Sequence, residues 1–174
     1  MAAGVTAIIN LRTKSEKSAA FDYEPECRRT NPATSFRHFP ILDQNVADDA
    51  KVELLLAELL ARLEGGAVLF VHCKGGHGRT GTICALLLGR LYGLRGAAAL
   101  VRMQACHDCR NTPVYRAGGP DLPAAASALF PPQQAQVARL LAANERASPT
   151  ERRLAALVAV GERDQAPPTL RYIW

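Results

Sequence analysis

The sequence predicts an α/β layered fold with a largely parallel sheet, because strand-like segments alternate with helical ones along the chain. Residues 5–11 (VTAIINL) and 67–71 (AVLFV) are apolar runs of strand length, and residues 35–39 form a third strand candidate that Pro40 stops. Leucines recur at helical spacing in residues 49–64 and 82–92. In such sheets ligands bind beyond the carboxyl ends of the strands, so we expect the functional site there.

The first half of the chain carries clear helix boundaries. Residues 14–29 are polar and mixed, and they predict a loop with at most a helical turn. Asp48 and Asp49 are candidate N-caps of the long helix that follows, and Gly65-Gly66 ends it. The apolar face of this helix consists of Val52, Leu55, Leu56, Leu59, Leu60 and Leu63.

The second half is mainly helical in its sequence pattern. The helix after residue 81 closes at Gly93, and another is expected from residue 97 to about 107. Residues 111–129 are rich in Pro, Gly and Ala and predict a loop. Pro131-Pro132 then opens a helix through about residue 143, and Ser148-Pro149-Thr150-Glu151 resembles a capping box of a further helix.

Composition and charge suit a small globular enzyme. The 174 residues predict one main domain at 1–145, followed by a C-terminal helix and tail at 146–174. The net charge of +5 suits an anionic substrate without selecting among phosphoprotein, phospholipid and nucleic acid. No apolar stretch has the length of a membrane span, and we find no secretory signal. An odd count of five cysteines favours a reducing compartment, so we expect a cytoplasmic protein.

Residues 68–81 (VLFVHCKGGHGRTG) carry the strongest functional signal. A buried strand ends at His72-Cys73, a glycine-rich turn follows, and a helix begins near Arg79-Thr80. Backbone N–H groups and the helix dipole favour a thiolate at Cys73, whereas only roughly 3% of an ordinary cysteine is ionised at pH 7. Arg79 presents a planar fork that can hold two phosphate oxygens. The glycines that let the backbone approach a tetrahedral anion are Gly75, Gly76, Gly78 and Gly81.

This segment resembles the HCxxGxxR[S/T] signature of cysteine-dependent protein tyrosine and dual-specificity phosphatases. The resemblance covers roughly residues 4–143 and is dense at 36–45 and 68–92. It implies a three-layer fold whose central, largely parallel sheet has four to five strands flanked by helices. It also implies hydrolysis of phosphomonoesters through a phosphocysteine at Cys73, without a metal or another cofactor. The family usually has one more strand before residues 4–11, so either the sequence is truncated or the chain lacks that strand.

The resemblance also assigns roles to individual residues. Arg79 would clamp the phosphate, Thr80 would assist departure of the sulfur, and His72 would orient the cysteine loop. The general acid is expected at Asp43, in a segment (PILDQN) that resembles the Pro-x-x-Asp stretch of the family. Asp48 and Asp49 are the alternatives, although helix capping already explains them. The substrate-binding positions would be His72, Lys74, Gly75, Gly76, His77 and Gly78.

Lys74 and His77 leave the substrate class open. Phosphoinositide phosphatases related to tensin have a similar loop with basic residues at both positions, so phosphoinositide hydrolysis is the alternative function. The short chain, which has no polybasic strip, instead resembles small dual-specificity phosphatases. We therefore expect a monomer that acts on phosphorylated proteins and binds no nucleic acid. A non-catalytic phosphate-binding protein is less favoured, because the cysteine, arginine and aspartate are all present.

Two further cysteine features are interpreted without a functional role. Cys106-His107-Asp108-Cys109 is a lone CxxC without a second ligand pair, so we expect no metal site and no redox role there. Cys84 lies on the helix after the glycine-rich turn and is interpreted as a core residue rather than as a thiol that protects Cys73.

Overall fold

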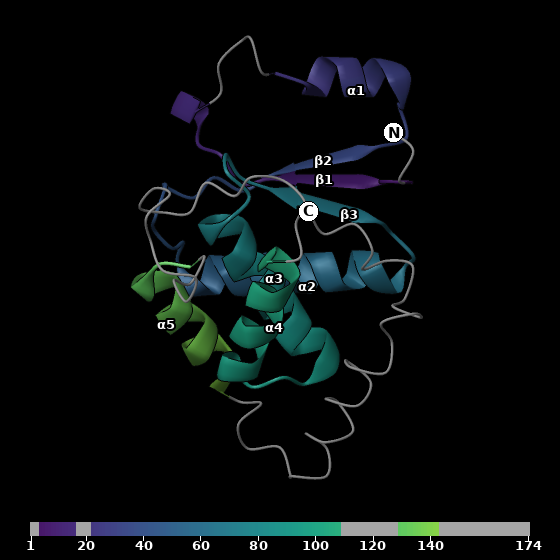
Figure 1. Cartoon of the computed structure of the whole chain (residues 1–174). Coiled ribbons are helices and arrows are strands. Elements are labelled where there is room, and N and C mark those ends of the chain that lie inside the picture. The colour runs from purple at the N-terminus through teal and green to yellow at the C-terminus, as the bar shows by residue number, and fades with distance from the viewer. Residues whose placement is uncertain (1–3, 17–21, 109–128, 143–174) are drawn as a thin grey trace.

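A computed structural model describes residues 4–16, 22–108 and 129–142, and the fold is an α/β arrangement with a small parallel sheet (Figure 1). The described strands are β1 (Ala7–Asn10), β2 (Ser35–His38) and β3 (Leu69–His72). They pair in parallel in the order β2-β1-β3, so the first strand is the central one. Parallel pairing brings the carboxyl ends of all three strands to one edge of the sheet.

Helices cover both faces of this sheet (Figure 1). The short α1 (Glu24–Thr30) lies on one face, while α2 to α5 lie on the other. This second group consists of α2 (Asp49–Glu64), α3 (Gly78–Tyr92), α4 (Gly96–Asp108) and α5 (Pro131–Leu140). A 3-10 turn, η1 (Lys14–Glu16), follows β1. The three layers agree with the fold expected from the sequence.

The main core lies between the sheet and the larger group of helices. Ala7 pairs with Leu69 and Ile9 pairs with Val71, so these four buried side chains share the helix-facing side of the sheet. The helical face that packs here is the one predicted from leucine spacing. Its buried members on α2 are Val52, Leu55, Leu56, Leu59 and Leu63, and α3 adds Ile83, Leu86 and Leu87.

The ends of the helices also follow the sequence pattern. The Asp48 side chain accepts a hydrogen bond from Lys51 N at 3.2 Å and caps α2 as predicted. Gly93 adopts φ 60° after α3, a left-handed conformation that glycine tolerates without strain. These caps mark the start of α2 and the end of α3.

The sheet and one helix differ from the sequence predictions. The described residues contain three strands, where four to five were expected. Residues 24–30 form α1 instead of a loop. This helix buries no side chain, and ion pairs between Arg28 and Glu24 and between Arg29 and Glu26 support it. Its polar surface left no apolar periodicity to detect.

Some predictions lie outside the described residues. They are the loop expected through most of 111–129, the capping box at 148–151 and the C-terminal unit at 146–174. Cys109, the second cysteine of the CxxC, is also outside them.

Candidate active site

The glycine-rich turn links the carboxyl end of β3 to the start of α3. Cys73 directly follows β3, and its side chain is buried, with 7% of the residue exposed. The loop turns back over the sulfur, because Gly76 N donates a hydrogen bond to Cys73 Sγ at 3.2 Å. Gly76 itself has φ 66°, which an L side chain rarely adopts. The local sequence therefore forms a closed loop around one thiol.

The environment of Cys73 favours its thiolate. Burial is the largest influence on the pKa of this thiol, and it raises the pKa. The hydroxyl and the N–H of Thr80, the charge of Arg79 and the N–H of Gly76 act in the opposite direction, and together they hold the pKa below its ordinary value. Among the described residues, Thr80 Oγ1 has no partner of regular hydrogen-bond geometry, so its proton is available to the sulfur.

Arg79 is buried and held from two sides. Only 2% of Arg79 is exposed, and its two terminal nitrogens bond to the Glu16 carboxylate at 2.7 and 2.8 Å. Arg79 NH1 also donates to Ile41 O at 3.0 Å. This bidentate pairing fixes the plane of the guanidinium. It also lowers the pKa of Glu16 from 4.5 to about 2, chiefly because Arg79 donates to the carboxylate.

Asp43, in the segment between β2 and α2, reaches the same guanidinium. Its Oδ1 lies 2.9 Å from Arg79 NH2, while its side chain stays 66% exposed. A tight turn holds it there, in which Asn45 N donates to Leu42 O at 3.1 Å and Asn45 Nδ2 donates to Asp43 O at 3.2 Å. The turn includes Gln44 with φ 62°. Asp43 is thus both beside the arginine and open to a bound molecule.

The other two aspartates considered as acids are occupied elsewhere. Asp48 caps α2, and Asp49 pairs with Arg139 of α5 at 2.6 Å. The structure therefore brings Asp43 to Arg79 and leaves Asp48 and Asp49 in structural contacts.

His72 connects the cysteine loop to α1. Burial lowers the pKa of His72, so the ring is neutral near pH 7. Its Nδ1 lies 3.1 Å from Cys73 O, and its Nε2 is hydrogen-bonded to the Tyr23 hydroxyl. Burial raises the pKa of Tyr23 to about 12, so the phenol keeps its proton. The consistent arrangement has Tyr23 donating to Nε2 and Nδ1–H donating to Cys73 O.

His77, expected among the substrate-binding residues, contacts a residue of α4. Its Nδ1 lies 2.6 Å from Nε2 of His107 on α4, and the two ring centroids are 4.9 Å apart. His107 is buried, with 3% exposed. The His77 side chain therefore packs toward α4, whereas Lys74 is exposed to solvent. Of the predicted backbone positions, Gly75 and Gly76 lie in the loop and Gly78 is the first residue of α3.

Three residues that contact the site were not found from the sequence. Glu16 bonds Arg79, Tyr23 bonds His72, and Gln133 packs on Gly78. A Cβ at Gly78 would lie 2.6 Å from Gln133 Oε1, so a larger residue here would force the Gln133 side chain to move. Glu16 and Tyr23 lie in the polar segment at 14–29, which has no motif that marks either of them.

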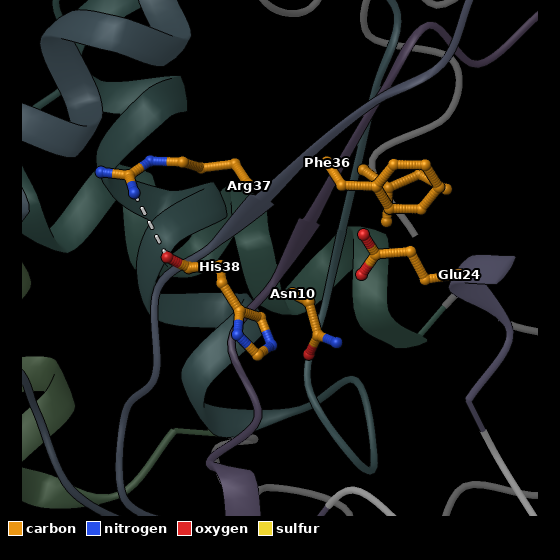
Figure 2. Close-up of a pocket in the computed structure, with 6 residues that line it drawn as sticks. Asn10, Glu24, Phe36, Arg37 and His38 are labelled. Atoms are coloured by element: carbon orange, nitrogen blue, oxygen red, sulfur yellow. Dashed lines mark hydrogen bonds between the residues drawn. The ribbon is translucent and has the colours of Figure 1, made fainter. Parts of the chain in front are cut away.

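A separate pocket of about 230 Å³ lies on the α1 side of the sheet (Figure 2). Its lining consists of Ile8, Asn10, Glu24, Phe36, Arg37 and His38. Cys73, Arg79 and Asp43 do not line it, so it is not the space above the thiol.

The described ranges contain neither a candidate metal cluster nor a candidate membrane span. Within them, no cluster of three or more His, Cys, Asp or Glu side chains could hold a metal ion. Within the same ranges, no helix is long and apolar enough to cross a membrane.

Residues 1–119 match a family model described as PTP-SAK, "Swiss Army Knife protein, DSP-PTPase phosphatase domain". This chain belongs to that dual-specificity phosphatase family. A curated relative, the "Putative tyrosine phosphatase 197R" of Invertebrate iridescent virus 6, is 43% identical over 54 residues. The aligned segment is 29% of this chain and 20% of the viral protein, so the chain covers only a fifth of that relative.

Solved phosphatase structures share the fold. Tk-PTP in its active form has a TM-score of 0.59 at 22% identity, with 83% of this chain and 81% of that one covered. Human DUSP28 has a TM-score of 0.57 at 22% identity, with 84% of each chain covered. A kinase associated phosphatase whose catalytic cysteine is replaced by serine has a TM-score of 0.60 at 19% identity, covering 84% of this chain and 74% of that one. These likenesses establish the architecture of the phosphatase domain.

Proposed function

We propose that this protein is a cysteine-dependent protein tyrosine or dual-specificity phosphatase that acts on phosphorylated proteins. The observation that carries the proposal is the meeting of three groups at one edge of the sheet. Cys73 follows β3, Arg79 lies in the first turn of α3 and helps to lower the pKa of that thiol, and Asp43 lies 2.9 Å from the same arginine. A nucleophile, an anion clamp and an exposed acid are the groups that phosphate ester cleavage requires.

In the first step the Cys73 thiolate attacks phosphorus. The S–P bond forms while the bond from phosphorus to the leaving oxygen breaks, and Asp43 gives its proton to that oxygen. The N–H groups of the loop and Arg79 Nε–H, which has no partner among the described residues, hold the equatorial oxygens of the transferring group, and Arg79 NH2 adds a contact when Asp43 turns to the leaving oxygen. Because Arg79 is fixed by Glu16, its fork is oriented before substrate arrives.

In the second step water hydrolyses the phosphocysteine. Asp43, now a carboxylate, takes a proton from the attacking water. The S–P bond breaks and the sulfur leaves as a thiolate, which the Thr80 hydroxyl and the Gly76 N–H stabilise. The neutral His72, held between Tyr23 and Cys73 O, keeps the start of the loop in place.

One feature that suggested phosphoinositide hydrolysis is the pair of basic side chains at Lys74 and His77. It is weakened because His77 packs against His107. A phosphorylated protein is therefore the substrate class that we propose. We also propose that the protein works in the cytoplasm, because the reaction needs a reduced thiol. We further propose that it is a monomer, which gel filtration would test.

Hydrolysis of an aryl phosphate in the presence of EDTA tests this function. We expect turnover by the wild-type protein, none above background for Cys73→Ser, and release of phosphate from phosphotyrosine peptides. Asp43→Asn should slow the reaction and flatten the limb of the pH profile that reports the acid. Full activity of Cys73→Ser, or loss of wild-type activity in EDTA, would overturn the mechanism. A preference for phosphoinositides over phosphopeptides would overturn the substrate class.

A further inference from the structure

Helix α5 contacts the segment that joins the Asp43 turn to α2. Three side chains of α5, spaced three residues apart, make these contacts. Gln133 Nε2 donates to Asn45 O at 3.2 Å, and Gln136 Nε2 donates to Ala47 O at 2.7 Å. Residues three apart on a helix lie on one face, so α5 presents a polar face to the segment at 45–49.

The contacts at Asp49 are charged. Arg139 bonds both carboxylate oxygens of Asp49, at 2.6 and 2.9 Å, and Gln136 Nε2 adds a third bond at 2.8 Å. Arg139, and after it Gln136, lower the pKa of Asp49 to about 2, so the carboxylate is charged wherever a phosphatase works. Gln136 is 1% exposed, and two acceptors of the segment satisfy its amide.

The other side of α5 is packed tightly on α3 and α4. A Cβ at Gly89 would lie 2.2 Å from Leu141 Cδ1, and a Cβ at Gly96 would lie 2.8 Å from Ala138 Cα. Both glycines allow an approach that a larger residue would prevent. Arg90 NH2 also donates to Leu140 O at 3.1 Å. Arg79 lies in the first turn of α3. The packing of α5 on α3 therefore fixes the position of α5 relative to Arg79.

The segment at 45–49 leads directly to the acid. Asn45 closes the turn around Asp43 through its backbone N–H and its side-chain amide. On the other side of Asp43, Ile41 O accepts from Arg79. The turn is therefore tied to Arg79 at its start and to α5 at its end.

We propose that Gln136 and Arg139 are positioning residues, which set the place of the acid Asp43 relative to Cys73 by anchoring Ala47 and Asp49. The proposal rests on the function proposed above, in which Asp43 protonates the leaving oxygen. Neither side chain touches the reacting atoms, so their effect passes through the segment at 45–49. Displacing a reacting group by about 1 Å can slow a reaction about 100-fold.

The leaving group of the substrate separates this role from a general loss of structure. An acid matters most when the leaving oxygen is a strong base, and it matters least when the leaving group departs without a proton. We would measure kcat/KM, which reports the step that cleaves the leaving group, for phenyl phosphate, a poor leaving group, and for 4-nitrophenyl phosphate, a better one. In Gln136→Glu and Arg139→Gln we expect kcat/KM for phenyl phosphate to fall about 10-fold or more, with a much smaller fall for 4-nitrophenyl phosphate.

Matched variants give the control. Gln134→Glu makes the same change on the same helix, at a side chain that donates to Leu129 O, and it should keep the wild-type ratio of the two rates. Arg139→Lys keeps the charge and should recover part of the loss. Arg139 is exposed, so its variants report even if the buried Gln136→Glu fails to fold. The inhibition constant for inorganic phosphate should stay unchanged, because the cysteine loop is not altered.

The outcomes are distinguishable from failure of the proposed function. Equal slowing of both substrates by the α5 variants, or no slowing, would overturn the positioning role if Asp43→Asn itself shows the leaving-group dependence. If Asp43→Asn shows no such dependence, the acid assignment fails, and the positioning role fails with it.

Discussion

Replacing Glu16 by glutamine removes the carboxylate that orients Arg79. Glu16 accepts two hydrogen bonds from the guanidinium and two more from Thr13, and glutamine keeps a single acceptor oxygen. Arg79 is only 2% exposed, so water replaces the lost partner poorly. We therefore expect Glu16→Gln to lower both the free energy of unfolding and kcat/KM.

The pKa of Glu16 sets the size of the effect on stability. Its fall from 4.5 to about 2, caused chiefly by the bond from Arg79, corresponds to about 3 kcal/mol at roughly 1.4 kcal/mol per pH unit. The Glu16 side chain is 17% exposed, so solvent screening makes this an upper value, and we expect about 2 kcal/mol. Because the folded-state pKa is depressed, this stability is present above pH 4.5 and is lost as the pH falls toward 2.

Urea unfolding at pH 7 and at low pH measures this free energy, and kcat/KM for an aryl phosphate measures the loss of orientation. At pH 7 we expect the Glu16→Gln protein to unfold more easily by about 2 kcal/mol, and its kcat/KM to fall about 10- to 100-fold. The two proteins should converge in stability as the pH approaches 2.

Glu26→Gln is the matched control. Glu26 also pairs with an arginine, but both side chains are well exposed, at 63% and 72%, and such pairs contribute little. We expect no measurable change in the free energy of unfolding and normal activity. If Glu16→Gln behaves like Glu26→Gln in both assays, the account of Arg79 as a prepositioned clamp is wrong.

Three further changes test the site and its frame. The rate at which iodoacetamide alkylates Cys73 should rise with pH as the thiolate forms. Thr80→Ala should move the midpoint of this pH dependence to higher pH, because the Thr80 hydroxyl and N–H help to lower the pKa of the thiol. An unchanged midpoint would show that the Thr80 hydroxyl does not stabilise the thiolate. Tyr23→Phe, which leaves Nε2 of His72 without its donor, should lower kcat with little loss of stability, and wild-type kcat would contradict the orienting role. Gly89→Ala should destabilise the fold by about 1 to 3 kcal/mol in thermal unfolding, because the new methyl group meets the side chain of Leu141; a neutral result would mean that α5 can shift away.

The glycine-rich turn and its flanking residues could be predicted because they are contiguous in the sequence. The strand, the glycines, the cysteine and the arginine occupy residues 68–81, and local backbone geometry is enough to bring them together. The helix at 49–64 was predictable for a similar reason, since its buried leucines recur at the helical period. By contrast, α1 has no buried side chain, so it offered no apolar pattern.

The partners of the loop could not be predicted, because they come from distant parts of the chain. Glu16 and Arg79 are 63 residues apart, and Tyr23 and His72 are 49 apart. They meet because β1 and β3 are parallel neighbours, so the segments that follow both strands emerge at the same edge of the sheet. Nothing in the residues at 14–29 indicates this pairing.

The sequence by itself determined the chemistry: a cysteine and an arginine on a glycine-rich loop, with an aspartate nominated by resemblance. Tertiary structure alone decided how these groups are held. It placed Asp43 rather than Asp49 beside Arg79, gave the guanidinium a carboxylate partner in Glu16, and turned His77 toward α4. The physical reason is that a motif fixes neighbours along the backbone, whereas burial, ion pairing and orientation depend on which elements pack together in space.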